Sequence, residues 1–233
     1  MDGRSAAAEC RDNPSAAIDS SPSAISTALL LAEALGTLAF AVSGLIAAAG
    51  RRFDAVGVVM VAGVTAFGGG TLRDVLLDRR PFFWVERVEW LWALLVLCLL
   101  AMLMLRARHF GITRRAILWP DAIGLGLFTA NGAQIAHAMD LPALVCVLMG
   151  MITAVFGGVI RDVLCNELPA AFSDHRPYAV CSFAGGWVLL GAHALGSPVW
   201  LALVMATVAT AGLRMAAVFS DWSLPPWKAH EDA

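Results

Sequence analysis

Long apolar runs, separated by short polar connections, occupy the chain from residue 24 to residue 219. A membrane-spanning helix needs about 20 mainly apolar residues, because backbone groups in hydrocarbon find hydrogen-bond partners only within the helix itself. The segments of that length and character are residues 24–50, 53–77, 84–105, 117–138, 143–164, 178–195 and 198–219. The pattern predicts an all-α integral membrane protein with seven transmembrane helices.

The composition supports this class and characterises the two ends. Apolar residues make up 59% of the 233 residues and charged residues 15%, with a mean hydropathy of +0.74. A water-soluble domain carries about 25% charged residues, so the composition excludes that class. Residues 1–23 contain no apolar run and predict a disordered N-terminal tail, and residues 220–233 form a short C-terminal tail.

Part of the chain is repeated. A shift of 88 residues aligns residues 32–77 with residues 120–165 without a gap and gives 15 identities in 46 positions; the strongest match pairs TAFGGGTLRDVL with TAVFGGVIRDVL. We therefore expect two three-helix units, residues 24–107 and 117–195, with the helix at 198–219 outside the repeat. Three crossings are an odd number, so the second unit starts from the opposite face of the membrane, as in the inverted repeats of transporters.

Glycines cluster in the second span of each unit, as Gly68, Gly69 and Gly70 and as Gly157 and Gly158. Each costs about 1 kcal/mol relative to alanine inside a helix, which predicts a break or sharp kink. Backbone freed by a break is tolerated in a membrane only where it is buried in protein or lines a wet cavity, here beside Thr65 and Thr153. The alternative is that the glycines merely permit close packing.

Two charged pairs follow the glycines: Arg73 with Asp74, and Arg161 with Asp162. A charge inside a span costs several kcal/mol unless it is paired or hydrated. Because neighbouring residues on a helix point about 100° apart, we expect each arginine to pair with the aspartate of the other unit. The alternative is that these residues form salt bridges that only hold the two halves together.

Other polar residues favour a cation. Glu33 and its repeat counterpart Asp121 add two carboxylates, and Ser43, Asn131 and Gln134 add hydroxyl and amide oxygens. Such a lining suits a partly hydrated monovalent cation. The two carboxylates are also compatible with helix starts near the membrane interface.

Small residues recur at four-residue intervals in the first helix of each unit. They include Gly36 and Gly44, repeated as Gly124 and Gly132. This spacing places them on one helix face, where they allow a neighbouring backbone to approach, within the subunit or between subunits.

The remaining residue types point away from an enzyme. The five cysteines and five histidines have no metal-ligand spacing, and neither a catalytic triad nor a phosphate-binding loop is evident. We therefore expect no metal site, no cofactor and no nucleic-acid or soluble protein partner. With seven spans, one side carries five basic residues and the other nine, which favours an outside N-terminus and a cytoplasmic C-terminus.

The GGGxxRD at residues 68–74 and the GGxxRD at 157–162, in a 3+3+1 arrangement of spans, resemble the bacterial members of the trimeric intracellular cation channel family, which also carry the label of a glycine-transporter domain. The resemblance covers residues 24–219. It implies a homotrimer in the bacterial inner membrane with one pore per subunit, lined by kinked second and fifth spans and permeable to monovalent cations, potassium favoured. Phe156 departs from the motif, because Gly68 stands at the matching position of the first unit. A secondary transporter of a small amino acid such as glycine is the alternative.

Overall fold

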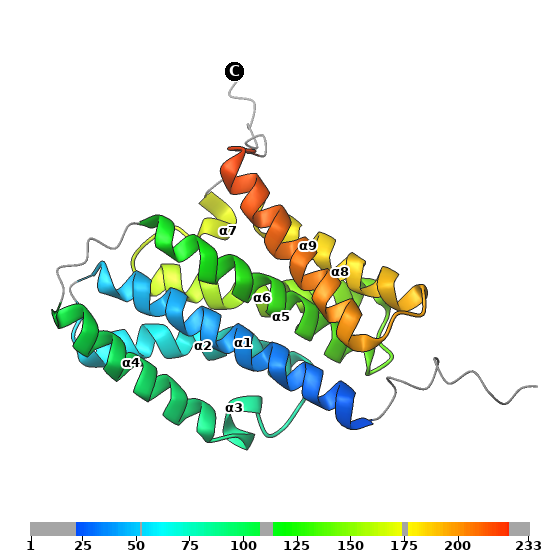
Figure 1. The fold of residues 1–233 in the computed structure, drawn as a ribbon, viewed down its shortest axis with the longest axis horizontal. Helices are drawn as coiled ribbons and strands as arrows, with labels where there is room; N and C mark the ends of the chain where they lie inside the picture. The colour runs from blue at the N-terminus through cyan, green and yellow to red at the C-terminus, as the bar shows by residue number, and fades with distance from the viewer. Residues whose placement is uncertain (1–21, 52, 108–113, 174–176, 224–233) are drawn as a thin grey trace, which may run out of the picture.

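The protein is an all-α bundle in the computed structural model, which describes residues 22–51, 53–107, 114–173 and 177–223 (Figure 1). Each of the seven predicted segments contains one long helix. The helices are α1 (Pro22–Ala49), α2 (Ala55–Leu76), α3 (Phe83–Glu86), α4 (Glu89–Ala107), η1 (Arg114–Ile117), α5 (Leu118–His137), α6 (Ala143–Leu164), α7 (Ala170–Ser173), α8 (Ala179–Ala194) and α9 (Val199–Phe219).

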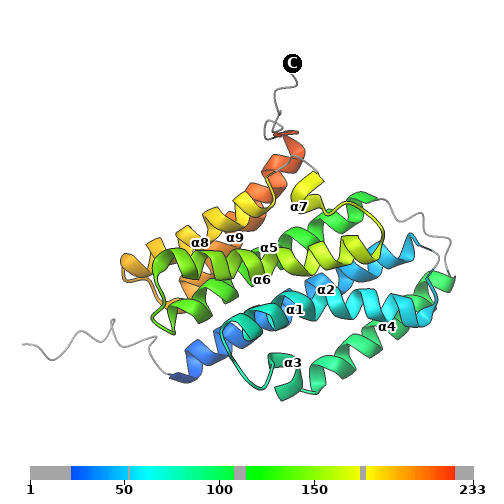
Figure 2. The same ribbon diagram turned by 180° about the vertical axis from the view of Figure 1, so that it is seen from behind.

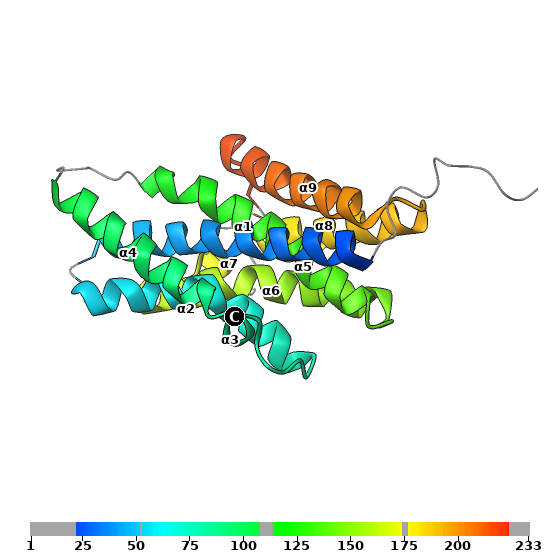
Figure 3. The same cartoon turned by 60° about the horizontal axis from the view of Figure 1, so that its bottom comes forward.

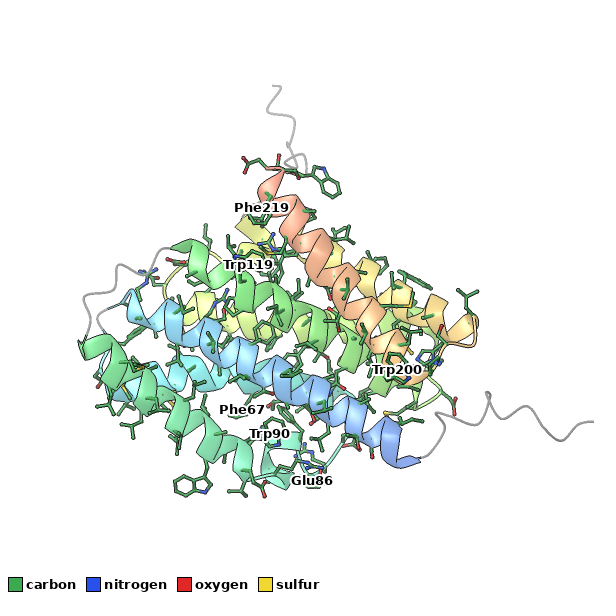
Figure 4. All side chains as sticks on the ribbon, viewed as in Figure 1. Phe67, Glu86, Trp90, Trp119, Trp200 and Phe219 are labelled. Carbon is green, nitrogen blue, oxygen red and sulfur yellow. The ribbon has the colours of Figure 1, made fainter. Side chains whose placement is uncertain are left out.

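Four helices form the centre of the bundle: α1 packs on α2 and α5, and α6 packs on the same two helices from the other side. Helix α4 lies along α1 and α2 (Figure 3), whereas α8 and α9 lie side by side against α5 and α6 (Figure 2). Trp119 at the start of α5 meets Phe219 at the end of α9, with ring centroids 6.2 Å apart, so these two helices run antiparallel (Figure 4).

Helices α1, α2, α6 and α9 are long and apolar enough to cross a membrane by length and composition, and the apolar helices α4 and α8 are shorter. Their outward faces carry exposed leucines, among them Leu35 on α1 and Leu99 on α4. Exposed leucines at this density need a surrounding lipid phase, because a water-soluble surface rarely presents apolar patches of this extent.

The third predicted span is wrong at its start. Residue 84 belongs to the short helix α3, and the long helix α4 begins only at Glu89. The chain is extended at Arg87, and Phe83 is buried with its ring 5.9 Å from that of Phe67. Trp84 also donates a hydrogen bond to the Thr71 hydroxyl at 3.0 Å, so contacts with α2 hold α3 apart from α4.

The predicted break at the glycines is also wrong, whereas the kink that was its alternative stays a prediction. Helix α2 continues through residues 68–70, and α6 continues through Gly157 and Gly158, without interruption. The cost of glycine in a helix is about 1 kcal/mol per residue, and here it is offset because the two helices approach each other closely at these positions. The packing alternative is the one that the structure supports.

The glycines of α1 and α5 also lie at close contacts, in pairs that the repeat relates. A Cβ at Gly36 would lie 3.0 Å from the Phe128 ring, and one at Gly124 would lie 2.9 Å from the Phe40 ring. The two rings touch, with centroids 5.3 Å apart. Gly44 meets the backbone of α2, and Gly132 meets Thr153 of α6.

Most of the two predicted tails lies outside the described residues. Helix α1 begins at Pro22, so only residues 22 and 23 of the predicted tail 1–23 are described. The predicted tail 220–233 is described only as far as residue 223.

Candidate functional site

The closest approach in the bundle is the crossing of α2 and α6. A Cβ added to Gly69 would lie 2.0 Å from the carbonyl oxygen of Thr153, and one added to Gly157 would lie 2.5 Å from the carbonyl oxygen of Thr65. Both threonine hydroxyls are buried and donate at 2.6 Å to the carbonyl four residues earlier in their own helix. These four predicted pore residues therefore form a helix–helix contact.

The other glycines of the motif face side chains instead of backbone. A Cβ at Gly68 would lie 3.3 Å from the Ile160 side chain, whereas one at Gly70 would lie 2.5 Å from the Phe83 ring. Gly158 faces the hydroxyl of Tyr178 at 3.1 Å. Of the motif glycines, only Gly69 and Gly157, at the middle position, contact the backbone of the partner helix.

Beside this crossing lies the first charged cluster, formed by Glu33, Arg73 and Asp74. Arg73 is fully buried; its Nη2 lies 2.8 Å from Glu33 Oε1, and its Nε donates to Asp74 Oδ1 at 2.9 Å. The other oxygen of Asp74 accepts the backbone N–H of Phe83 at 3.1 Å. Arg79, a surface residue, also contacts this aspartate, with its Nη1 3.4 Å from Asp74 Oδ1.

The second charged cluster, formed by Asp121, Arg161 and Asp162, repeats this arrangement in the other half. The Nη1 of Arg161 donates to Asp121 Oδ1 at 2.5 Å, and its Nε donates to Asp162 Oδ1 at 2.9 Å. The other oxygen of Asp162 accepts the backbone N–H of Ala170 at 2.9 Å, as Asp74 does for Phe83. Each cluster thus holds one guanidinium and two carboxylates.

The predicted exchange of partners between the halves is wrong, because each arginine pairs with the aspartate that follows it in its own helix. Backbone directions 100° apart do not prevent this contact, since the long arginine side chain bends back and its planar guanidinium offers several donors. The second partner is a carboxylate from the first helix of the same unit, Glu33 for Arg73 and Asp121 for Arg161.

Two uncharged residues at equivalent positions in the repeat connect each charged cluster to the other half. Arg161 Nη1 donates to Ser43 Oγ at 2.5 Å, and Asn131 Nδ2 donates to Glu33 Oε1 at 3.4 Å. Each cluster is therefore contacted by one polar side chain of the other unit. Gln134 lies apart from both, because its Oε1 is 2.5 Å from His193 Nε2.

The alternative that Glu33 and Asp121 lie at helix starts is confirmed for Asp121 only. Asp121 lies in the first turn of α5. Glu33 lies in the interior of α1, which begins at Pro22. Both nevertheless meet a buried guanidinium, so position along the helix does not separate their roles.

Comparison with known proteins decides the family. The model of a family described as glycine transporter matches twice, at residues 30–106 and 118–194, so its two matches start 88 residues apart, the offset of the internal repeat. A UPF0126 membrane protein of Vibrio cholerae is 37% identical over 210 residues, covering 88% of this chain and 85% of that one. The inner membrane protein YadS of Escherichia coli K12 is 36% identical, covering 86% and 96%.

Solved structures of trimeric intracellular cation (TRIC) channels share the fold. The orthologue from Rhodobacter sphaeroides has a TM-score of 0.77 at 31% identity, with 84% of this chain and all of that chain covered. A TRIC channel whose structure was used to explain conductance has a TM-score of 0.73 at 33% identity, covering 87% and 98%. The chain is a bacterial member of the TRIC channel family.

In this TRIC family member, sequence reasoning missed two residues that lie beside the second cluster. The ring of Tyr178 is buried at the start of α8, and the Arg214 guanidinium of α9 stacks on it 4.8 Å from the ring centroid. Such a cation–π contact is strongest where water is excluded. Two signals were available, since Tyr178 is the one tyrosine in the chain and Arg214 is a lone charge within an apolar helix.

Proposed function

We propose that this TRIC family member is a passive channel for monovalent cations, with potassium favoured, that assembles as a homotrimer with a pore in each protomer lined by α2 and α6. The observation that carries the proposal is the pair of buried charged clusters, each with two carboxylates to one arginine inside an apolar bundle. Charge in such surroundings marks an ion pathway by default. An excess of carboxylate favours cations over anions.

The proposal includes seven membrane crossings and two three-helix units of opposite orientation in the bacterial inner membrane, the N-terminus outside. Reciprocal contacts support it: α2 Gly69 meets Thr153, and its repeat counterpart Gly157 meets Thr65. A twofold axis between the units generates such exchanged pairs. The apolar helices and the membrane-protein relatives support the location.

The arginines set a condition for ion passage. Arg73 is 0% exposed and Arg161 5% exposed, and α2 and α6 are unbroken, so the case for conduction does not rest on interrupted helices. An ion passing beside either cluster requires its guanidinium to move. Of the three side chains of the first cluster, that of Glu33 is the most exposed, at 17%.

Flux in liposomes tests the proposal. Purified protein in vesicles with a potassium gradient and an impermeant anion is expected to give unitary currents that reverse near the potassium equilibrium potential. Saturable, gradient-coupled glycine uptake without unitary currents would instead establish the transporter alternative. We expect no catalytic activity, because the proposed role needs none.

A charge-neutral variant tests the site itself. Glu33→Gln keeps an acceptor oxygen for Arg73 and removes one negative charge, so potassium current is expected to fall severalfold while the protein stays folded. Glu86→Gln, at an exposed position of α3 (Figure 4), is the matched control and should conduct as the unchanged protein does. Equal currents in both variants would remove the first cluster from the pathway.

A further inference from the structure

A cavity outside the charged clusters opens where α5 ends, α6 begins and α8 ends, three helix ends that meet at one end of the bundle (Figure 1). Its volume is about 580 Å³. Leu141, Trp187 and Leu190 give it an apolar wall, and His137 and His193 are its imidazole groups. The proposed conduction path uses none of these residues.

The two histidines are brought together by the fold alone, since His137 ends α5 and His193 lies in the last turn of α8. Their ring centroids are 4.9 Å apart, with 33° between the ring planes. Both side chains are half-buried, so each ring keeps access to water. Their separation in the sequence hid this pair from a search for metal-ligand spacing.

The hydrogen bond with Gln134 fixes which nitrogen of His193 carries the proton. Its Oε1 lies 2.5 Å from His193 Nε2 and can only accept a hydrogen bond, so Nε2 carries the proton and donates it. The Nδ1 of His193 is then left with a free lone pair. A histidine that binds a metal commonly donates its other N–H to an oxygen in this way, which orients the ring and makes it a better ligand.

We propose that His137 and His193 form a binding site for a divalent transition-metal ion such as Zn²⁺, oriented by Gln134. Imidazole nitrogens bind Zn²⁺ at about 2.0–2.1 Å in tetrahedral geometry, which places the centroids of two rings on one ion about 5 Å apart. The observed 4.9 Å matches this separation. Potassium, calcium and magnesium prefer oxygen ligands, so the site is chemically separate from the proposed conduction path.

The coordination is incomplete and therefore exchangeable. Across the described residues no group of three or more His, Cys, Asp or Glu side chains is placed to share a metal, so the proposed site leaves the remaining coordination positions to water. Affinity should be below that of four-ligand structural zinc sites, and it should weaken on acidification, because protons compete for the imidazole lone pairs.

Calorimetric titration with Zn²⁺ tests the site in full-length protein purified in detergent without a polyhistidine tag. One ion per subunit is expected, with a rise in the unfolding temperature. His137→Ala and His193→Ala should each lower affinity at least about tenfold, and Gln134→Ala should lower it less. His230→Ala, which removes a histidine far away in the sequence, is the matched control and should bind as the unchanged protein does.

Two further measurements keep the outcome decisive. His193→Asn retains a partner for Gln134 and should also lose binding, so a folding defect in the alanine variant does not obscure the result. Mg²⁺ in excess should not compete with Zn²⁺. Unchanged stoichiometry and affinity in the His137→Ala/His193→Ala double variant, or an equal loss in His230→Ala, would overturn the proposal, whatever the flux measurements show.

Discussion

The two charged clusters share a charge pattern and differ in their surroundings. Each holds one arginine between two carboxylates, and in each the following aspartate also accepts a backbone N–H from the next short helix. The first cluster is reached from the surface by Arg79, whose side chain is 43% exposed. The second is covered by the buried ring of Tyr178, with Arg214 behind it.

This difference shows which features of the duplicated unit are tied to the buried charge and which are free to vary. The arginine cannot change singly, because removing it leaves two carboxylates without their buried partner. The residues around them differ, since Arg79 reaches Asp74 in the first cluster and the Tyr178 ring, stacked on Arg214, lies beside the second. The two halves are therefore alike in charge pattern and differ in the side chains that surround it.

The largest expected effect comes from the crossing that both clusters flank. Gly69→Ala places a methyl group 2.0 Å from a backbone oxygen, and Gly157→Ala places one at 2.5 Å. Neither oxygen can move without shifting a helix, so we expect losses of about 3 kcal/mol or more for the first and less for the second. Thermal unfolding in detergent measures both.

Gly68→Ala is the control for this pair, because its new methyl group meets only the flexible end of Ile160 at 3.3 Å. Alanine is favoured over glycine in a helix by about 1 kcal/mol, so this variant should be as stable as the unchanged protein or more stable. Normal stability in Gly69→Ala would show that the two helices are not held at this separation.

The next effect separates the clusters directly. Arg161→Gln removes the buried guanidinium that pairs with both Asp121 and Asp162, at an expected cost of about 3 kcal/mol, the lower end of the range for a broken buried ion pair. Arg73→Gln should cost less, because Arg79 remains 3.4 Å from Asp74. Unfolding temperatures of the two variants give the order.

A second substitution checks that charge is the cause. Adding Asp121→Asn to Arg161→Gln removes one of the stranded carboxylates and should recover part of the stability. If Arg73→Gln proves the more damaging variant, the view that Arg79 compensates for the lost guanidinium fails.

Hydropathy predicted the positions of the long helices well, because an apolar run of about 20 residues depends on composition and little on contacts. The start of α4 was missed since it depends on Phe83 packing under Phe67, which no local pattern encodes. The break at residues 68–70 was wrongly expected because the cost of glycine was judged on an isolated helix. In the folded protein the same glycines permit the α2–α6 contact.

The charged residues were found from the sequence, but their partners were not. Ionisable side chains inside apolar runs are conspicuous, so all six members of the two clusters could be named in advance. The pairing was misjudged because the rotation of about 100° per residue fixes only where each side chain leaves the helix. The guanidinium lies several bonds further out and can bend back to a neighbouring residue. Tyr178 and Arg214 come from segments outside the aligned repeat, so comparing the two halves could not find them.

The smallest expected effect on stability is that of Arg79→Gln, which changes a contact of the first cluster alone. An exposed ion pair contributes about 0–1 kcal/mol, so unfolding should change little. The variant removes the exposed cation that reaches Asp74, so the first cluster carries more net negative charge. On the proposed function, potassium current should rise at low salt, and the gain should shrink at high salt as screening increases.

Arg80→Gln is the matched control, because Arg80 stacks on Phe82 at the same surface and should leave the current unchanged. An equal change in both variants would mean that surface charge in general, and not access to the first cluster, sets the current.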